Sequence, residues 1–524
     1  MMGIREAWWW HYKPTDRVIG NYQLGNRDEY IDMCEEADKY GVRIISDVLP
    51  NHTTPQLDTV SDNLANAAGG KTTGVLYHNC GFNEIQNYGN RYECTLGQMG
   101  GLPDANTENQ GFQAYYIKFC NDVVACGGDG FRYDTAKHIG VHSDPKVSSN
   151  TRGVNDFWDV ATGQKEVNGV KFNKPDNLFI YGEVLQDDGM PYGEYASYMN
   201  MTASSYGHIL RDKLGNYSLN SGDISDWVHA TPDKIVTWVE SHDTYCNDHE
   251  SAWMNDWQLR AGWAVIAARN NGTPLFFSRP DGSDGKSKNY YGKNVLGAVG
   301  NDQFKHPEVA ACNYFRNAMV GESEYISNPN GNGSVLVIER GTKGAVIMNL
   351  GFDVANVKLN KVADGTYLEG VSGKQVQVSG GTLNHTIHGG TIAVVYSGTP
   401  ITKDPSVSKD SSNFTAPFEL TLTPANADKA TYSINGGAEV EFTKATKITI
   451  GEGCEIGDKV TIKVTATGEG EPFSKTYTYT MIDTPDIPEA KIYIRVKKLD
   501  FSSAPKCLCI CRWNTCKRVK WRLG

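Results

Sequence analysis

Two spacings of apolar residues alternate along the first 300 residues. Within 28–40, apolar and small residues recur at helical spacing, and after Gly41 a short apolar run follows at 42–45. The same unit recurs, with helices expected at 111–126 and 256–269 and strands at 130–133, 177–181, 234–239 and 273–277. Strands that alternate with helices predict a parallel sheet with helices on its faces.

The pattern changes after about residue 300. Short strands between 333 and 397, separated by Gly and Asn turns, predict an antiparallel β-sandwich. A second all-β segment looks like an immunoglobulin-like or fibronectin-like spacer. The predicted organisation is an α/β domain at 1–300, a β-sandwich at 301–398, a linker at 399–413, a β module at 414–482, a linker at 483–490 and a tail at 491–524.

The net charge of −11 is distributed unevenly over the 524 residues. Residues 491–524 hold ten Lys or Arg and one Asp, which gives +9, so the other 490 residues carry −20. A chain this acidic disfavours a long polyanion as partner. No apolar run reaches the roughly 18–20 residues that a membrane helix needs. We therefore expect no nucleic-acid partner, no membrane partner and a monomeric chain.

Carboxylates and histidines follow four of the expected strands. A single aspartate after a strand is most often a helix N-cap or a turn residue, and a single histidine is more often a core residue. Parallel α/β folds, however, form their sites at the carboxyl ends of strands, so four such ends predict one shared cleft. The residues are Asp47, Asn51, His52, Asp134, Lys137, His138, Glu183, Glu240, His242 and Asp243.

Carboxylates without a nucleophilic Ser or Cys motif favour acid–base chemistry with a carboxylate nucleophile. Glycoside cleavage needs two carboxyl groups in different states. One is ionised and attacks the anomeric carbon or stabilises its charge, and the other is protonated and donates to the leaving oxygen. A third carboxylate can bind sugar hydroxyls and raise the pKa of the acid by like-charge repulsion.

Four ordered motifs resemble those of the glycoside hydrolase family 13 α-amylases. They are DVLPNH at 47–52, GFRYDTAKH at 130–138, GEV at 182–184 and ESHD at 240–243, with GLPD at 101–104 similar to a fifth. Flanking stretches at 8–15, 206–208 and 273–280 look like the secreted Firmicutes α-amylases of the Bacillus subtilis type. The resemblance covers residues 4–398. It implies endo-hydrolysis of α-1,4-glucosidic bonds in starch, glycogen and maltooligosaccharides, outside the cell when the chain is full-length.

The resemblance also implies a role for each motif residue. Asp134 would be the nucleophile that forms a covalent glycosyl-enzyme, Glu183 the general acid/base, and Asp243 would bind the distorted sugar. Because the family retains anomeric configuration, the carboxyls of Asp134 and Glu183 should lie about 5–5.5 Å apart. Arg132, two residues before Asp134 on the same strand face, would keep it ionised. The expected substrate-binding residues are Tyr12, His52, Arg132, Lys137, His138 and His242, with Lys137 on the leaving-group side.

A calcium ion is implied by the same resemblance. Calcium prefers oxygen ligands from carboxylates, amides and backbone carbonyls. Asn51 and Asp104 would supply side-chain oxygens, and Thr95 and His138 backbone carbonyls. Gly127 and Asp129 would help to hold a further ion. From the residues alone, Asn51 and Asp104 are equally well explained as turn residues.

The sequence departs from the family near its start. The family barrel has eight strands, of which the first two precede the segment 8–10. We therefore expect a (β/α)8 TIM barrel that lacks its first strands, with a B domain inserted at 51–108. One hypothesis is an active α-amylase. A second is a fragment that binds α-glucan without turnover, and a third is a related transglycosylase or α-glucosidase.

The basic tail is the second departure. Residues 491–494 look like the first strand of a starch-binding domain, but the Cys-, Lys- and Arg-rich stretch after them does not continue it. Cys507, Cys509, Cys511 and Cys516 lack the spacing of zinc ligands. A basic patch for nucleic acid or membrane is one interpretation. A frameshift near 496–505 is the one we favour.

Overall fold

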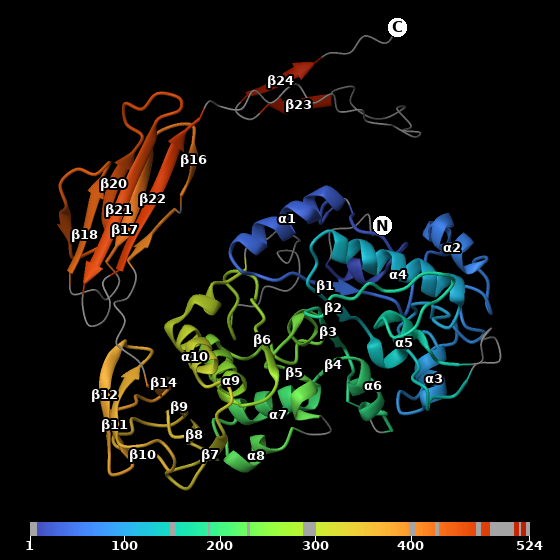
Figure 1. Cartoon of the computed structure of the whole chain (residues 1–524), viewed down its shortest axis with the longest axis horizontal. Helices are drawn as coiled ribbons and strands as arrows, with labels where there is room; N and C mark the ends of the chain where they lie inside the picture. The colour runs from blue at the N-terminus through green and yellow to red at the C-terminus, as the bar shows by residue number, and fades with distance from the viewer. Residues whose placement is uncertain are drawn as a thin grey trace. The chain divides into compact units, whose positions relative to one another are not determined.

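The chain divides into two compact units, one made mostly of residues before Lys403 and the other mostly of residues from Lys403 onward (Figure 1). The first unit contains a parallel sheet followed by an antiparallel sheet, and the second unit is all-β. The computed structural model describes residues 8–21, 23–146, 154–186, 189–227, 231–286, 300–397, 405–409, 411–424, 429–467, 473–482, 508–512 and 515–519.

A six-stranded parallel sheet forms the centre of the first unit. Its strands pair in chain order: β1 (Ile45–Val48), β2 (Gly130–Tyr133), β3 (Phe179–Gly182), β4 (Asn200–Thr202), β5 (Ile235–Trp238) and β6 (Thr273–Leu275). Every residue of β2 and β5 is buried, which is typical of parallel strands covered on both faces. The expected parallel sheet is confirmed, and β1 and β6 are its end strands as described.

Helices and short turns alternate with these strands. Asn26 and Asn255 begin the first and last long helices of the set through capping boxes with Glu29 and Gln258. The helices are α1 (Arg27–Lys39), α4 (Gln110–Ala125), α5 (Phe157–Ala161), α6 (Tyr192–Tyr198), α7 (Ser204–Gly215), α8 (Ser221–Ser225) and α9 (Asp256–Ala268). The shorter turns are η1 (Trp8–Tyr12), η3 (Ala136–His138), η4 (Pro232–Lys234) and the π-helical η5 (Asp243–Asn247).

The first strand begins later than its apolar pattern predicts. A strand was expected at 42–45, but β1 begins at Ile45, and Val42 is 54% exposed. Pairing with β2 sets the register and places Asp47 opposite Arg132, so the strand continues through polar residues. The sequence pattern gave no sign of β4, because three residues are too few to show a period.

The segment between β1 and α4 carries η2 (Leu57–Thr59), α2 (Asp62–Ala68) and α3 (Arg91–Leu96). Leu64, Leu76 and Tyr77 of this segment are fully buried in the same apolar core as Phe112 of α4 and Phe131 of β2. This shared core fixes the segment against the sheet beside the strand that precedes Asp134.

An antiparallel sheet of eight strands follows η6 (Gln303–Lys305) and α10 (Pro307–Ala318). Val335 comes from a strand near one end of the sheet order and Val357, Val376 and Leu383 from neighbouring strands at the other end, yet all four share one core. The expected sandwich is thus built from one sheet that curves over itself. Its strands are β7 (Glu324–Ser327), β8 (Val335–Arg340), β9 (Gly344–Asn349), β10 (Val357–Lys358), β11 (Gly365–Glu369), β12 (Lys374–Ser379), β13 (Thr382–Asn384) and β14 (Thr391–Tyr396).

The second unit packs a three-stranded sheet and a five-stranded sheet around Leu420, Ile462 and Tyr479. The first sheet contains β15 (Ser406–Val407), β17 (Phe418–Thr423) and β20 (Thr446–Ile450). The second contains β16 (Ser412–Phe414), β18 (Lys429–Ile434), β19 (Val440–Phe442), β21 (Lys459–Thr467) and β22 (Phe473–Met481). In the tail, β23 (Leu508–Arg512) pairs antiparallel with β24 (Thr515–Val519), whereas the strand expected at 491–494 lies outside the described residues.

Two properties of the described residues bear on the class of protein. None of their helices combines the length and the apolar character needed to cross a membrane. The eight cysteines from Cys34 to Cys454 are all free, so no disulfide stabilises this part of the described chain.

Candidate active site

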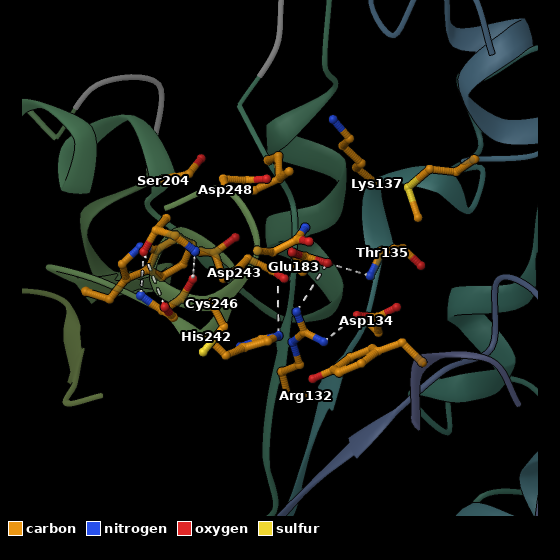
Figure 2. Close-up of a pocket in the computed structure, with 18 of the residues that line it drawn as sticks. Arg132, Asp134, Thr135, Lys137, Glu183, Ser204, His242, Asp243, Cys246 and Asp248 are labelled. Atoms are coloured by element: carbon orange, nitrogen blue, oxygen red, sulfur yellow. Dashed lines mark hydrogen bonds and ion pairs between the residues drawn. The ribbon is translucent and has the colours of Figure 1, made fainter. Parts of the chain in front are cut away.

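The carboxyl ends of the central strands open onto one cleft of about 900 Å³ (Figure 2). Asp134 follows β2, Glu183 follows β3, and His242 and Asp243 follow β5. The structure thus brings together side chains that are far apart in the sequence. The predicted residues that line the cleft are Tyr12, His52, Arg132, Asp134, Lys137, His138, Glu183, His242 and Asp243.

The guanidinium of Arg132 joins three carboxylates at the base of this cleft. Its Nη1 donates to Asp134 Oδ1 at 2.5 Å and to Asp47 Oδ1 at 2.9 Å. Its Nη2 lies 3.2 Å from Glu183 Oε2. Arg132 and Asp134 are buried, at 8% and 5% exposure. Because one guanidinium reaches both Asp134 and Glu183, these carboxylates border the same small space (Figure 2).

The environment shifts the pKa values of the carboxylates in different directions. Burial raises the pKa of Asp134 well above its ordinary value, opposed by Arg132 and reinforced by Glu183 and Asp47. Burial also acts to raise the pKa of Glu183, but Arg132 and the Thr135 N–H outweigh it and lower that pKa. The two directions differ because Glu183 accepts from the Thr135 N–H in addition to its contact with Arg132. The roles expected for the two carboxylates stay predictions.

Thr135 has an unusual backbone that serves Glu183. Its φ of 49° and ψ of 34° lie in the left-handed region, which a β-branched residue rarely adopts. In this conformation the Thr135 N–H donates to Glu183 Oε2 at 2.9 Å. The turn after β2 therefore holds the carboxylate of Glu183, which follows β3. No sequence motif predicts this contact.

Aromatic rings surround His242 on two sides. The Tyr12 ring stacks on the imidazole with centroids 5.4 Å apart at 12°, and the Trp8 ring meets it edge-on, also at 5.4 Å. His242 Nε2 lies 3.5 Å from Asp243 Oδ2. The Tyr12 hydroxyl donates to Asp47 Oδ2 at 2.7 Å. These contacts fix one wall of the cleft, and Trp8 is part of that wall.

Two further histidines of the cleft, His52 and His138, are neutral near pH 7. Burial lowers the pKa of His52 to about 4 and that of His138 to about 3. His138 Nδ1 lies 2.8 Å from the carbonyl oxygen of Cys94, so this nitrogen is the donor. His52 Nε2 lies 2.9 Å from the carbonyl oxygen of Tyr12. Both rings can therefore act as hydrogen-bonding groups that carry no charge.

Glu240 follows β5 but does not line the cleft. Its carboxylate pairs with Arg279, with Oε2 at 2.7 Å from Nη2, and both side chains are almost completely buried. Arg279 also donates to the carbonyl oxygens of Met254 and Ser251, each at 2.8 Å. This pair braces the segment that carries His242 and Asp243, so Glu240 has a supporting position.

The proposed calcium ligands fit an oxygen-ligated cation. Asn51 Oδ1 and Asp104 Oδ1 are buried and have no hydrogen-bond partner in the described part of the chain. The two residues are neighbours, because the Ala105 N–H donates to the Asn51 carbonyl at 2.8 Å. The His138 ring contacts Cys94, which adjoins Thr95. The two unpartnered oxygens, one from an amide and one from a carboxylate, are of the kinds that calcium prefers.

Gly127 and Asp129 lie apart from that group, at the opposite end of β2 from Asp134. Asp129 accepts a hydrogen bond from the Ile44 N–H at 2.8 Å and pairs with Arg43 at 3.4 Å. These contacts give Asp129 a structural explanation in the turn before β2. A further ion at this place stays a prediction.

The cleft also contains residues that the sequence analysis did not select. Ser204, Ser205, His208 and Arg211 come from α7, and Asp248 from the segment after η5. On α7 they recur at helical spacing, so one face of this helix borders the cleft. The sequence did not indicate this face, because the short strand β4, which places the start of α7 at the cleft, was not predicted. His78 was also missed, and it bridges Asp104 and Glu108 at 2.5 and 2.6 Å.

Comparison with known proteins finds α-amylases among the relatives of this chain. Residues 12–262 match the family described as the α-amylase catalytic domain. The chain is 43% identical over 414 residues to an α-amylase of Butyrivibrio fibrisolvens and 36% identical over 396 residues to an α-amylase of Clostridium acetobutylicum. Each alignment covers 74% of this chain, but only 42% and 48% of the relative. The chain thus spans less than half the length of these two relatives.

Solved structures with little sequence identity share the fold. A mutant of α-amylase I from Eisenia fetida in complex with maltohexaose has a TM-score of 0.56 at 16% identity, covering 75% of this chain and 88% of that one. The γ-CGTase of alkalophilic Bacillus clarkii has a TM-score of 0.52 at 17% identity, covering 90% and 71%. At this level of identity the likeness concerns the fold alone.

Proposed function

We propose that this chain, whose residues 12–262 match the α-amylase catalytic domain, hydrolyses internal α-1,4-glucosidic bonds of starch, glycogen and maltooligosaccharides. The observation that carries this proposal is the contact of one guanidinium, that of Arg132, with both Asp134 and Glu183. Two carboxylates that border one small space suit a retaining double displacement, in which they lie close together.

In the proposed reaction, a carboxylate oxygen of Asp134 attacks the anomeric carbon and forms a covalent glycosyl-enzyme. The glycosidic bond breaks, its electrons pass to the leaving oxygen, and Glu183 donates the proton to that oxygen. Glu183 then takes a proton from water, which attacks the same carbon and releases Asp134. The sugar is freed with its anomeric configuration retained.

Bond breaking needs a proton on Glu183 and an anionic Asp134, whereas burial and the neighbouring carboxylates raise the pKa of Asp134. Positive charge that develops on the anomeric carbon stabilises the neighbouring Asp134 anion and lowers its pKa. We propose that this charge keeps Asp134 ionised while Glu183 donates its proton. Arg132 stays within reach of both carboxylates during the transfer.

The remaining cleft residues would hold the sugar chain. Asp243 and His242, joined at 3.5 Å, would bind hydroxyls of the distorted sugar, and the Tyr12 ring would stack on its face. His52 and His138 would add hydrogen bonds without charge. Lys137, only 5% exposed, would contact glucose on the leaving-group side.

A calcium ion fits the oxygens of Asn51, Thr95, Asp104 and His138. We propose that these residues hold it, and that its contribution when bound is to stabilise the segment 51–108 beside the catalytic strands. This segment supplies Lys137 and His138 with several of their neighbours. An extracellular place of action, as the resemblance implies, stays a prediction.

The proposal is tested by hydrolysis of an end-blocked maltoheptaose with purified 1–524 in the presence of Ca²⁺. Internal cleavage should release new reducing ends, and Glu183→Gln should lower kcat by at least about 10³-fold because the acid is lost. Glu36→Gln, an exposed glutamate of α1, is the matched control and should be unchanged. No release by the unmodified chain, equal release by Glu183→Gln, or products longer than the substrate would contradict the proposal.

A further inference from the structure

A buried arginine outside the carboxylate cluster connects the segment 51–108 to the cleft. Arg91 is the first residue of α3, and its side chain is 11% exposed. Its Nε and Nη2 donate to the two carboxylate oxygens of Asp144 at 2.8 and 2.6 Å. The Asp144 carboxylate, 2% exposed, also accepts from the Val141 N–H at 2.9 Å. This two-pronged geometry fixes the plane of the guanidinium.

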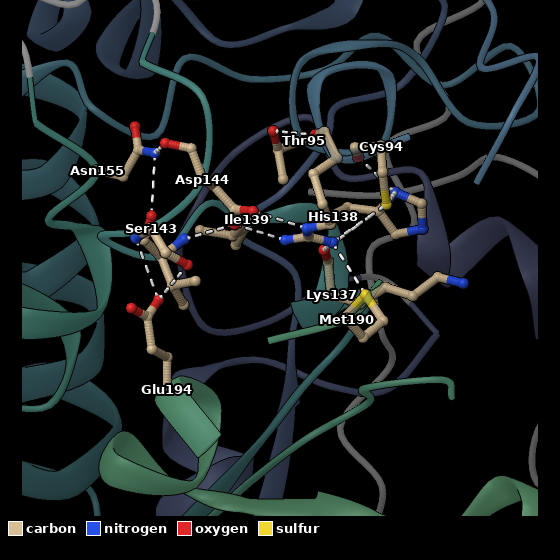
Figure 3. A network of polar contacts seen from close by, with 12 residues as sticks. Cys94, Thr95, Lys137, His138, Ile139, Ser143, Asp144, Asn155, Met190 and Glu194 are labelled. Atoms are coloured by element: carbon tan, nitrogen blue, oxygen red, sulfur yellow. Dashed lines mark hydrogen bonds and ion pairs between the residues drawn. The ribbon is translucent and has the colours of Figure 1, made fainter. Parts of the chain in front are cut away.

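The same guanidinium also makes hydrogen bonds to and around the loop after β2. Nη1 donates to the carbonyl oxygen of Lys137 at 2.8 Å, and Nη2 to the Tyr195 hydroxyl at 2.8 Å. The Tyr195 hydroxyl in turn lies 2.7 Å from the Ile139 carbonyl and 3.2 Å from that of Lys137. Figure 3 shows this network around Lys137, Ile139 and Asp144. Arg91 therefore does more than pair with Asp144, because it also holds the backbone of the loop after β2.

The backbone of Lys137 is held from its other side as well. Its N–H donates to the carbonyl oxygen of Glu183 at 3.3 Å. Lys137 lines the cleft, and its ammonium lies 5.2 Å from the centre of the Tyr88 ring. Since both peptide groups of Lys137 are held, the direction of its Cα–Cβ bond is set, and the contact with Tyr88 limits the positions of the ammonium.

We infer that Arg91 is a positioning residue for the substrate-binding Lys137. It holds the Lys137 carbonyl and thereby aims the ammonium at the sugar on the leaving-group side. This inference rests on the proposed function, because it takes an α-glucan as the ligand of Lys137. It adds a residue from α3 that touches no substrate but determines how firmly the leaving-group side is bound.

Binding of maltoheptaose, measured by titration calorimetry in the Glu183→Gln background, tests the inference without turnover. Arg91→Lys keeps the charge but loses the fork, so the Lys137 carbonyl loses its donor. We expect the Kd to rise about tenfold, as for the loss of one charge-assisted hydrogen bond. In a Lys137→Met background the same substitution should change Kd less than about twofold, since the group that Arg91 aims is gone.

Arg27→Lys is the matched control. Arg27 also binds a carboxylate through Nε and Nη2, which donate to Asp122 Oδ1 at 3.0 and 2.7 Å. Neither residue lines the cleft, so the substitution should leave Kd unchanged. Tyr195→Phe removes the hydroxyl that, besides Arg91, contacts the Lys137 carbonyl. It should therefore also raise the Kd for maltoheptaose, but only when Lys137 is present. If the circular dichroism spectrum shows that Arg91→Lys does not fold, Tyr195→Phe replaces it in the test.

Equal losses with and without Lys137 would overturn the inference, and so would no loss for Arg91→Lys or an equal loss for Arg27→Lys. Binding by the Glu183→Gln parent in those cases would leave the proposed function standing. Absence of binding by the parent would overturn the proposed function and this inference together.

Discussion

Asp47 and Arg132 face each other in register across β1 and β2, and Arg132 Nη1 lies 2.9 and 3.1 Å from the two carboxylate oxygens of Asp47. The same nitrogen donates to Asp134 at 2.5 Å. Asp47 therefore shares this guanidinium nitrogen with Asp134, and the charge of Asp47 helps to raise the pKa of Asp134.

This sharing predicts the pH dependence of an Asp47→Asn variant. Removing the charge of Asp47 lowers the pKa of Asp134, because a like charge disappears and Arg132 is less divided. Asp134 attacks as an anion, so activity rises with pH as it ionises. A lower pKa therefore moves the acidic limb of the kcat/KM profile to lower pH.

The measurement is a pH profile of kcat/KM on end-blocked maltoheptaose. Tyr12→Phe is the control, because it removes the hydrogen bond to Asp47 without a change of charge and should leave the acidic limb in place. If the acidic limb of the Asp47→Asn profile did not move, or moved to higher pH, the charge of Asp47 would not be what raises the pKa of Asp134.

Much of this site follows from the sequence, for a physical reason. Asp134, Glu183 and Asp243 end or follow short buried strands, and a parallel sheet brings such ends to one edge. Local pattern and topology thus suffice to gather them. The exact boundaries did not follow, since β1 is set by its pairing with Arg132 and its neighbours rather than by its own apolar run.

Other features depend on contacts between distant segments. The hydrogen bond from the Thr135 N–H to Glu183 needs a left-handed backbone conformation at Thr135, which a threonine in the sequence does not predict. The contact of Arg91 with Lys137 joins α3 to the loop after β2, 46 residues away. The pKa directions of Asp134 and Glu183 likewise depend on how Arg132 is divided between them. Such information exists only in the folded chain.

The two orphaned oxygens of Asn51 and Asp104 predict a stabilising effect of calcium. The midpoint of thermal unfolding should rise when Ca²⁺ replaces EGTA, by an amount that corresponds to about 2.7 kcal/mol at a hundredfold excess over Kd. Asn51→Leu removes one oxygen at similar volume and should abolish most of this rise. Differential scanning calorimetry of the full chain at fixed pH gives the comparison.

Asp129→Asn distinguishes this site from a further ion at the other end of β2. Asp129 already accepts from Ile44 and pairs with Arg43, so its substitution should leave the response to Ca²⁺ unchanged. A response that survives in Asn51→Leu but is lost in Asp129→Asn would move the stabilising site to Gly127 and Asp129.

The buried pair of Glu240 and Arg279 predicts a large loss of stability when one partner is removed. Arg279 is completely buried, so Glu240→Gln leaves a cation without its counter-charge, and the free energy of unfolding should fall by about 3 kcal/mol or more. Nine of the 11 tryptophans precede residue 264, so urea unfolding followed by tryptophan fluorescence reports on this part of the chain. Arg27→Met, which breaks an exposed pair of the same geometry, should leave the midpoint nearly unchanged. If Glu240→Gln behaved like Arg27→Met, the pair would not brace the segment that carries His242 and Asp243.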